Sequence, residues 1–169
     1  MLDCQVALLE NAVARYGAEG KVPGPIGARH PSMAPFDVFR AQDGYFVIAA
    51  GNDAAFAKLC TVLDLPALAQ DARFAASRER VTHQAALKAL LEERLVTEPR
   101  ARWLQLLGAH GIPCGEYQTV AEVVQHPQIA ARGMVTQVRT PGGAPLNVSG
   151  NPLRAGQGDV VRRDPPALD

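Results

Sequence analysis

A stretch rich in glycine and proline divides this chain into a short amino-terminal segment and a longer remainder. Between residues 17 and 35 it contains four glycines and four prolines: Gly17, Gly20, Gly24, Gly27, Pro23, Pro25, Pro31 and Pro35. Proline lacks a backbone donor and glycine costs backbone order, so neither a helix nor a strand can continue through such a stretch. The sequence therefore predicts an extended linker over residues 21–34, with separate folded segments before and after it.

A helix is predicted before the linker. Apolar residues recur at intervals of three or four from residue 2 to residue 16, which is the spacing of one helical face. They are Leu2, Val6, Leu9, Val13 and Tyr16. No capping residue precedes this helix, and we therefore expect further protein before it.

A β-hairpin is predicted directly after the linker. Apolar residues alternate over residues 36–40 and recur over 45–50, on either side of Asp43-Gly44, a strong two-residue turn signal. Gly51-Asn52-Asp53 then interrupts the return strand. An Asn or Asp side chain at that point can cap a helix, which we expect to run to Leu63.

The remaining segments predict further helices and a second hairpin. They are a helix over Thr82–Val96, a helix capped by Thr97 with Glu98 and Pro99 in its first turn and ended by Gly111, an extended segment over Ile112–Gln118, a capping box from Thr119 to Glu122, a helix from Pro127 to Gly133, and a hairpin of Met134–Arg139 with Leu146–Ser149. Helices and hairpins in this order predict an α+β fold. The tail from Asn151 carries no core of its own.

Composition and charge exclude several classes of function. A chain of 169 residues is long enough for one domain with a hydrophobic core, and a formal net charge of zero implies neither a nucleic acid nor a membrane surface as partner. The apolar runs are too short for a membrane span. Three cysteines far apart in the sequence favour a reducing, cytoplasmic location over a disulfide framework. No group of cysteines and histidines has the spacing of a metal site.

The most suggestive local pattern is the turn at Ala49–Asp53. A glycine between an apolar strand and a helix lets backbone N–H groups face an anion or a carbonyl oxygen. The residues alone favour a simpler interpretation, a strand-to-helix turn with an Asn or Asp cap. Arg29 and His30, beside the rigid Pro31, offer a cation and an imidazole to a phosphate or a substrate. For this pair the residues alone favour a solvated linker.

Four sequence segments follow one another in the order typical of one enzyme family. They are GARHPSMAPFDVFRAQDGYFVIAAGND at residues 27–53, DARFAASRERV at 71–81, LLGAHGIPCGEYQTVAEVVQHPQIAARGMV at 106–135 and GNPLRAG at 150–156. Together they resemble the carboxy-terminal part of the class III CoA-transferases, the CaiB/BaiF family that includes formyl-CoA transferase-like enzymes. The resemblance covers nearly the whole chain.

The resemblance implies a fold. Members of the family have a large Rossmann-like α/β domain built from both ends of the chain and a small α+β domain between two linkers, and two subunits interlock as a homodimer. On this basis residues 1–20 are a helix of the large domain, 21–34 the first linker, 35–110 the small α+β domain, and 111–169 a return segment and hairpin toward the large domain. The chain is then a fragment of the class III CoA-transferase fold.

The resemblance also implies a mechanism. In the family an aspartate attacks an acyl-CoA, and CoA passes to a carboxylic acid through anhydride and thioester intermediates. That aspartate lies upstream of the segment that residues 1–16 resemble, so this chain contains no catalytic residue and we expect it to be inactive alone. The family's mobile glycine loop over the active site matches this chain at Ala49–Asp53, which makes Ala50, Gly51, Asn52 and Asp53 candidate substrate contacts. Arg29 and His30 are weaker candidates.

The expected partners follow from the same resemblance. They are acyl-CoA and carboxylate substrates, and either a second copy of the chain or a complementary amino-terminal chain. We expect no tightly bound cofactor and no metal. Two alternatives remain open. The α-methylacyl-CoA racemases share the fold and have a loop glutamate near the position of the shorter Asp53, and a truncated remnant with only a structural or interaction role would need no catalytic residue.

Overall fold

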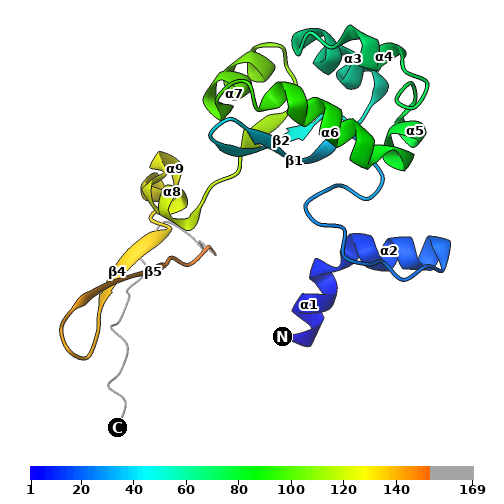
Figure 1. The fold of residues 1–169 in the computed structure, drawn as a ribbon. Helices are drawn as coiled ribbons and strands as arrows, with labels where there is room; N and C mark the ends of the chain where they lie inside the picture. The colour runs from blue at the N-terminus through cyan, green and yellow to red at the C-terminus, as the bar shows by residue number, and fades with distance from the viewer. Residues whose placement is uncertain (153–169) are drawn as a thin grey trace. The chain divides into compact units, whose positions relative to one another are not determined.

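A computed structural model describes residues 1–152 and divides the chain into two compact units, Met1–Glu116 and Tyr117–Asp169. The expected closing strand at 150–156 and the tail after it lie for the most part outside the described residues. Unit 1 contains a three-stranded sheet and the helices α1 to α7, and unit 2 contains two short helices and a two-stranded sheet (Figure 1). The protein is a mixed α/β structure.

The sheet of unit 1 is built on the predicted hairpin. Strands β1 (Phe36–Ala41) and β2 (Gly44–Ala49) pair antiparallel, with Phe39 opposite Phe46, so the predicted hairpin is confirmed. Its two-residue turn is Gln42-Asp43, one residue earlier than predicted, because Gly44 pairs with Ala41 as the first residue of β2. A third strand, β3 (Cys114–Glu116), pairs with β2 and lies beyond residue 110 in the sequence.

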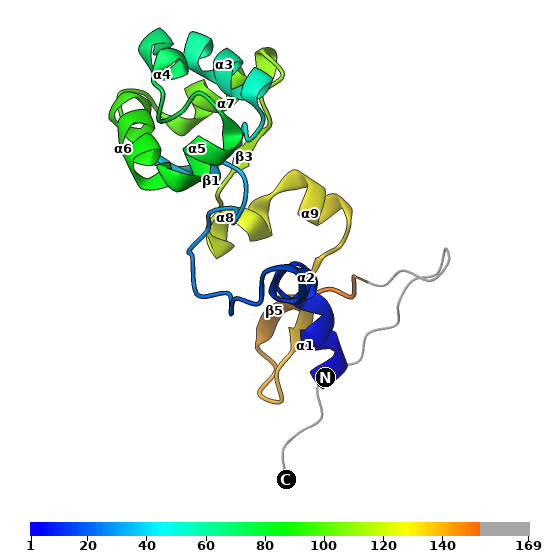
Figure 2. The ribbon, with the colours of Figure 1, turned by 90° about the vertical axis from the view of Figure 1, so that its right-hand side faces the viewer.

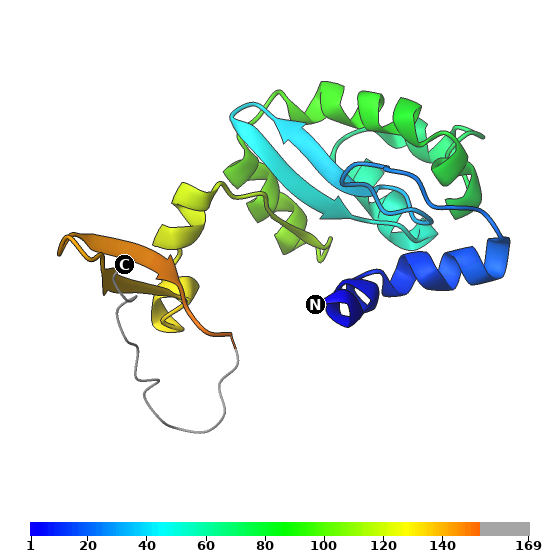
Figure 3. The ribbon, with the colours of Figure 1, turned by 90° about the horizontal axis from the view of Figure 1, so that it is seen from below.

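Helices α3 to α7 cover one face of this sheet (Figures 1 and 3). Their bounds are α3 Asp53–Val62, α4 Pro66–Gln70, α5 Ser77–Thr82, α6 Gln84–Leu95 and α7 Arg100–Ala109. Because strand residues alternate between the two faces, Phe39, Phe46 and Ile48 point to the helices and are buried. The core is completed by apolar side chains of the helices and their connections: Phe56, Leu59, Cys60, Leu63, Phe74, Leu87, Leu91, Leu95, Trp103 and Leu107.

Two helix boundaries differ from the sequence predictions. The helix predicted over 82–96 is split, because Thr82 ends α5 and α6 begins only at Gln84. The helix predicted over 2–16 is also split, into α1 (Leu2–Leu8) and α2 (Glu10–Glu19). At the break, the Leu9 N–H bonds to the Val6 carbonyl, three residues back instead of four.

The predicted cap of α7 is wrong. Thr97 does not cap this helix: its hydroxyl donates to the Arg94 carbonyl, and Pro99 occupies the N-cap position. The side chain that caps the start of α7 is Asp43 of the hairpin turn. Its carboxylate oxygen accepts a hydrogen bond of 2.8 Å from the Arg100 N–H. The turn residue therefore has a second role, which joins β1–β2 to α7.

Cys60 lies in the core of unit 1 with none of its surface exposed. Burial raises the pKa of its thiol to about 11, and the nearby charge of Arg80 offsets only part of this effect. An unfolded cysteine titrates near 8.5, so between these two values the unfolded state has lost a proton that the folded state keeps. The stabilising contribution is complete below pH ~8.5 and is lost as the pH rises toward 11.

We therefore expect the free energy of unfolding to fall by about 2–3 kcal/mol between pH 8 and pH 11 because of Cys60. Urea unfolding at a series of pH values, compared with Cys60→Ala, measures this contribution. The variant starts from a lower stability because it leaves a cavity, but its alkaline loss should be smaller by that amount. Equal alkaline slopes for the two proteins would contradict the assignment.

Unit 2 follows the sequence prediction closely (Figure 2). Its elements are α8 (Val120–Gln125), α9 (Pro127–Ala131), β4 (Val135–Arg139) and β5 (Pro145–Ser149), and β4 pairs antiparallel with β5. The capping box is confirmed, since the Thr119 hydroxyl accepts from the Glu122 N–H while the Glu122 carboxylate accepts from the Thr119 N–H.

Candidate functional site

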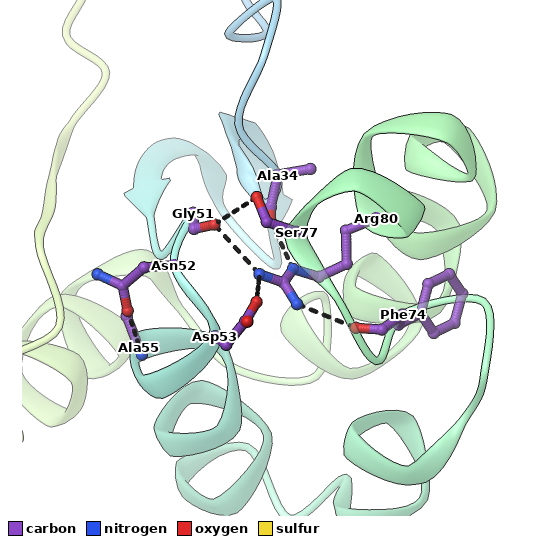
Figure 4. A network of polar contacts seen from close by, with 8 residues as sticks. All are labelled: Ala34, Gly51, Asn52, Asp53, Ala55, Phe74, Ser77 and Arg80. Atoms are coloured by element: carbon purple, nitrogen blue, oxygen red, sulfur yellow. Dashed lines mark hydrogen bonds and ion pairs between the residues drawn. The ribbon is translucent and has the colours of Figure 1, made fainter.

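Ala50, Gly51 and Asn52 connect β2 to α3, which begins at Asp53. Figure 4 shows Gly51, Asn52 and Asp53 with the residues around them. Asn52 caps α3, with its side-chain oxygen 2.8 Å from the Ala55 nitrogen, so the predicted cap is confirmed. Ala50 is buried, and its N–H donates to the Pro35 carbonyl. The turn is thus tied both to the helix that follows it and to the end of the linker.

A buried arginine lies directly beneath the turn. The side chain of Arg80, from α5, has no exposed surface, and its Nη2 donates to the Gly51 carbonyl at 3.1 Å and to the Asp53 carboxylate at 2.7 Å. Its Nε donates to the Ala34 carbonyl and its Nη1 to the Phe74 carbonyl. These partners offset the cost of removing a guanidinium from water. Arg80 is a site residue that no local sequence pattern predicts, because its partners lie up to 46 residues away in the chain.

The linker packs against the other side of the turn. A Cβ atom placed on Gly51 would lie 2.8 Å from the Cβ of Met33, a distance that real side chains do not reach. Gly51 is therefore required by the close approach of the linker. Its carbonyl also accepts a bond from the Ser77 hydroxyl at 3.2 Å.

Three backbone N–H groups of the turn are open to a ligand. Within the part of the chain that the structure describes, the N–H groups of Gly51, Asn52 and Asp53 make no hydrogen bond. They lie at the start of α3, where the helix dipole favours negative charge. The arrangement can donate to a carbonyl or carboxylate oxygen, as the pattern at Ala49–Asp53 indicated.

Arg29 is exposed and His30 is half-buried, as the residues alone predict for a solvated linker, but both also contact the folded unit. Arg29 donates from Nη1 to the Gln84 side-chain oxygen of α6 at 3.1 Å. The His30 ring stacks on Phe36 with its centroid 5.1 Å away, and its backbone N–H donates to the Phe36 carbonyl. Both residues attach the linker to the folded unit, and their recorded contacts are with α6, β1 and the linker itself.

A small cavity lies between β1 and α6, near the contact of Arg29. Its volume is about 10 Å³, room for roughly one water molecule, so it cannot hold a CoA thioester. Gln84 lines it, and within residues 1–152 the Gln84 side-chain nitrogen is buried without a hydrogen-bond partner. Asp37 and Lys88 also line the cavity, and the Lys88 ammonium donates to the Asp37 carboxylate at 2.8 Å and to the Val38 carbonyl.

Other chemistry is limited within residues 1–152. Among these residues no three side chains of the metal-binding types cluster together, and none of the helices combines the length and apolar character needed to cross a bilayer. Burial raises the pKa of the Cys114 thiol, which makes it less reactive rather than more.

The sequence model of CoA-transferase family III matches this chain over residues 1–169. The chain belongs to CoA-transferase family III. It is 46% identical to the acetyl-CoA:oxalate CoA-transferase of Acetobacter aceti over 153 residues, which cover 89% of this chain and 39% of that enzyme. It is 32% identical to the human succinyl-CoA:glutarate CoA-transferase, over 99% of this chain and 38% of that enzyme.

Solved structures of the same family resemble the fold. A CaiB/BaiF family protein from Brucella suis matches with a TM-score of 0.79 and 42% identity, over 96% of this chain and 42% of that one. The chain therefore spans less than half the length of the relatives that it matches.

Proposed function

We propose that this family III chain forms the carboxy-terminal part of a CoA-transferase, which moves CoA from an acyl-CoA to a carboxylic acid. The observation that carries the proposal is the family match over residues 1–169, together with relatives named as transferases between CoA thioesters and carboxylates. In this proposal residues 1–20 belong to the large α/β domain, 35–110 form the small domain, and 111–169 return toward the large domain.

The reaction proceeds through an aspartyl intermediate. The aspartate carboxylate attacks the thioester carbonyl, the C–S bond breaks, CoA leaves as a thiolate, and the acyl group remains on the aspartate as a mixed anhydride. The thiolate then attacks the aspartyl carbonyl, which releases the donor acid and leaves an aspartyl-CoA thioester. The acceptor carboxylate takes the same steps in reverse, so no proton or electron is consumed. In this proposal the aspartate comes from an amino-terminal segment that residues 1–169 do not include, and these residues hold none of the reacting side chains.

This chain supplies the turn at Ala50–Asp53 as a contact for the acyl-CoA. The three open N–H groups are donors for an oxygen of the thioester or of the acceptor carboxylate. Relatives named for oxalate, glutarate and mesaconate suggest a dicarboxylic acid as the acceptor. The working enzyme is a cytoplasmic homodimer, or an assembly with a complementary amino-terminal chain, and it holds no tightly bound cofactor.

No observation favours the racemase alternative. The Asp53 carboxylate is held at 2.7 Å by Arg80, so it is engaged in an ion pair at the position of the racemase glutamate. Relatives that are 46%, 35% and 32% identical to this chain are named as CoA-transferases or acyl-CoA transferases. A remnant without catalysis remains the outcome to be tested.

The test is CoA transfer with and without an amino-terminal partner. We expect the chain alone to transfer no CoA from acetyl-CoA to oxalate or from succinyl-CoA to glutarate, measured by chromatography of the CoA esters. Addition of the amino-terminal part of the Acetobacter aceti relative is expected to produce transfer. Turnover by the chain alone, or a covalent CoA adduct on it in mass spectrometry, would show that the aspartate is not missing. No CoA transfer either with or without the amino-terminal part would favour the alternative of a truncated remnant without catalytic activity.

A further inference from the structure

We propose that Arg80 is a positioning residue that holds the Gly51–Asp53 turn in one conformation and points the Asn52 N–H outward as a preformed donor. That this donor meets an acyl-CoA rests on the proposed function. The positioning itself rests only on contacts within unit 1.

The first step concerns the peptide unit between Gly51 and Asn52. Its carbonyl oxygen receives two donors from inside the fold, Arg80 at 3.1 Å and Ser77 at 3.2 Å (Figure 4). In a planar trans peptide the C=O and the N–H point in opposite directions. Holding the Gly51 carbonyl onto Arg80 therefore turns the Asn52 N–H away from Arg80, and Asn52 is exposed.

The second step concerns the rigidity of the arginine itself. The guanidinium is planar, and its bonds to Ala34, Phe74, Gly51 and Asp53 use donors on all three nitrogens. It also lies over the Phe56 ring, 4.6 Å from the centroid. The Arg80 guanidinium cannot rotate away from one partner without losing its bonds to the others. A lysine ammonium cannot reproduce this planar set of donors.

The third step concerns the linker. Because Arg80 binds the Ala34 carbonyl, and Met33 fills the space that a Gly51 side chain would need, the linker closes the turn from the other side. The turn is thus held from two sides, by α5 and by the linker, while Asn52 and Asp53 stay exposed. The family resemblance implies a mobile glycine loop here, whereas this turn has a single glycine, Gly51, bonded to a buried arginine.

The experiment compares Arg80→Lys with Arg94→Lys. Arg94 is a matched control, because it also donates to a backbone carbonyl, that of Leu63 at 3.0 Å, and lies over an aromatic ring, that of Trp103 at 5.0 Å. It makes no recorded contact with the turn. Both substitutions should lower the melting temperature, so stability alone does not distinguish them.

The deciding measurement is the backbone ¹⁵N order parameter of Gly51, Asn52 and Asp53. We expect values near about 0.85 in the wild-type chain and in Arg94→Lys, and values below about 0.6 in Arg80→Lys. Unchanged order in folded Arg80→Lys would overturn the positioning role. If Arg80→Lys does not fold, the wild-type chain decides: a turn with order below about 0.6, or Arg80 guanidinium protons averaged by free rotation, would also overturn it.

A second titration separates this inference from the proposed function. Acetyl-CoA added to the wild-type chain is expected to shift the Asn52 amide resonance, and the shift should be reduced in Arg80→Lys but not in Arg94→Lys. A turn that loses order in Arg80→Lys, combined with no response of Asn52 to acetyl-CoA, would support positioning by Arg80 and count against substrate contact at the turn.

Discussion

Trp103→Ala is expected to lower the free energy of unfolding by about 3–5 kcal/mol. The indole is 1% exposed, so the substitution leaves a large cavity in the core of unit 1. Its Nε1 donates to the Leu95 carbonyl at 2.7 Å, and the Arg94 guanidinium lies 5.0 Å from the ring centroid. Both contacts join α7 to the end of α6, so one change removes packing, a hydrogen bond and a cation–π contact.

Urea denaturation followed by far-UV circular dichroism measures this loss, since Trp103 is the single tryptophan and its fluorescence disappears with it. Trp103→Phe is the matched control. It keeps an aromatic ring but loses the N–H donor to the Leu95 carbonyl, and we expect a loss of about 1–2 kcal/mol. A loss below about 1 kcal/mol for Trp103→Ala would mean that the helices repack around the site.

The elements that could be predicted from the sequence are those whose signals are local. The β1–β2 hairpin, the cap at Asn52 and the capping box from Thr119 to Glu122 each depend on residues within a few positions of one another, although the hairpin turn lies one residue before the predicted Asp43-Gly44. The cap of α7 could not be found in this way. Its acceptor, Asp43, is 57 residues away from the Arg100 N–H, and Thr97 offered a local cap that the fold does not use.

The same distinction applies to the candidate site. The turn at Ala50–Asp53 was visible as a glycine between a strand and a cap, but the arginine beneath it was not. Arg80 is 46 residues from Ala34, 29 from Gly51 and 27 from Asp53, and an arginine in a short helix usually faces solvent. Only the contact of Arg80 with the Phe74 carbonyl is local, because both residues lie in the segment DARFAASRERV at residues 71–81.

Docking of the linker was missed for a related reason. Glycine and proline between residues 17 and 35 correctly predicted the absence of regular structure over residues 21–34. Glycine and proline content, however, predicts where regular secondary structure is absent and does not predict which residues the linker side chains contact. The bond of Arg29 to Gln84 and the stacking of His30 on Phe36 depend on partners that only the folded chain brings near.

The apolar face of α1 and α2 remains exposed in the structure. None of the residues in these helices is buried, and exposed fractions reach 76% for Leu2, 51% for Val6, 54% for Leu9 and 55% for Val13. Apolar surface leaves water with a gain of about 25 cal/mol per Å², so a row of such side chains favours association. We expect the full chain to sediment as a dimer or a larger assembly.

Deletion of residues 1–20 is expected to convert the protein to a monomer without unfolding it. The core of unit 1 is formed by side chains from Phe39 to Ile112, all of which lie outside the deleted segment. Loss of the exposed face removes the reason to associate, while the hairpin and the helices α3 to α7 keep their mutual contacts. Sedimentation velocity with far-UV circular dichroism tests both halves of this expectation. A full chain that sediments as a monomer would refute the role of the apolar face, and a deletion variant that unfolds would mean that residues 1–20 stabilise the core despite their exposure.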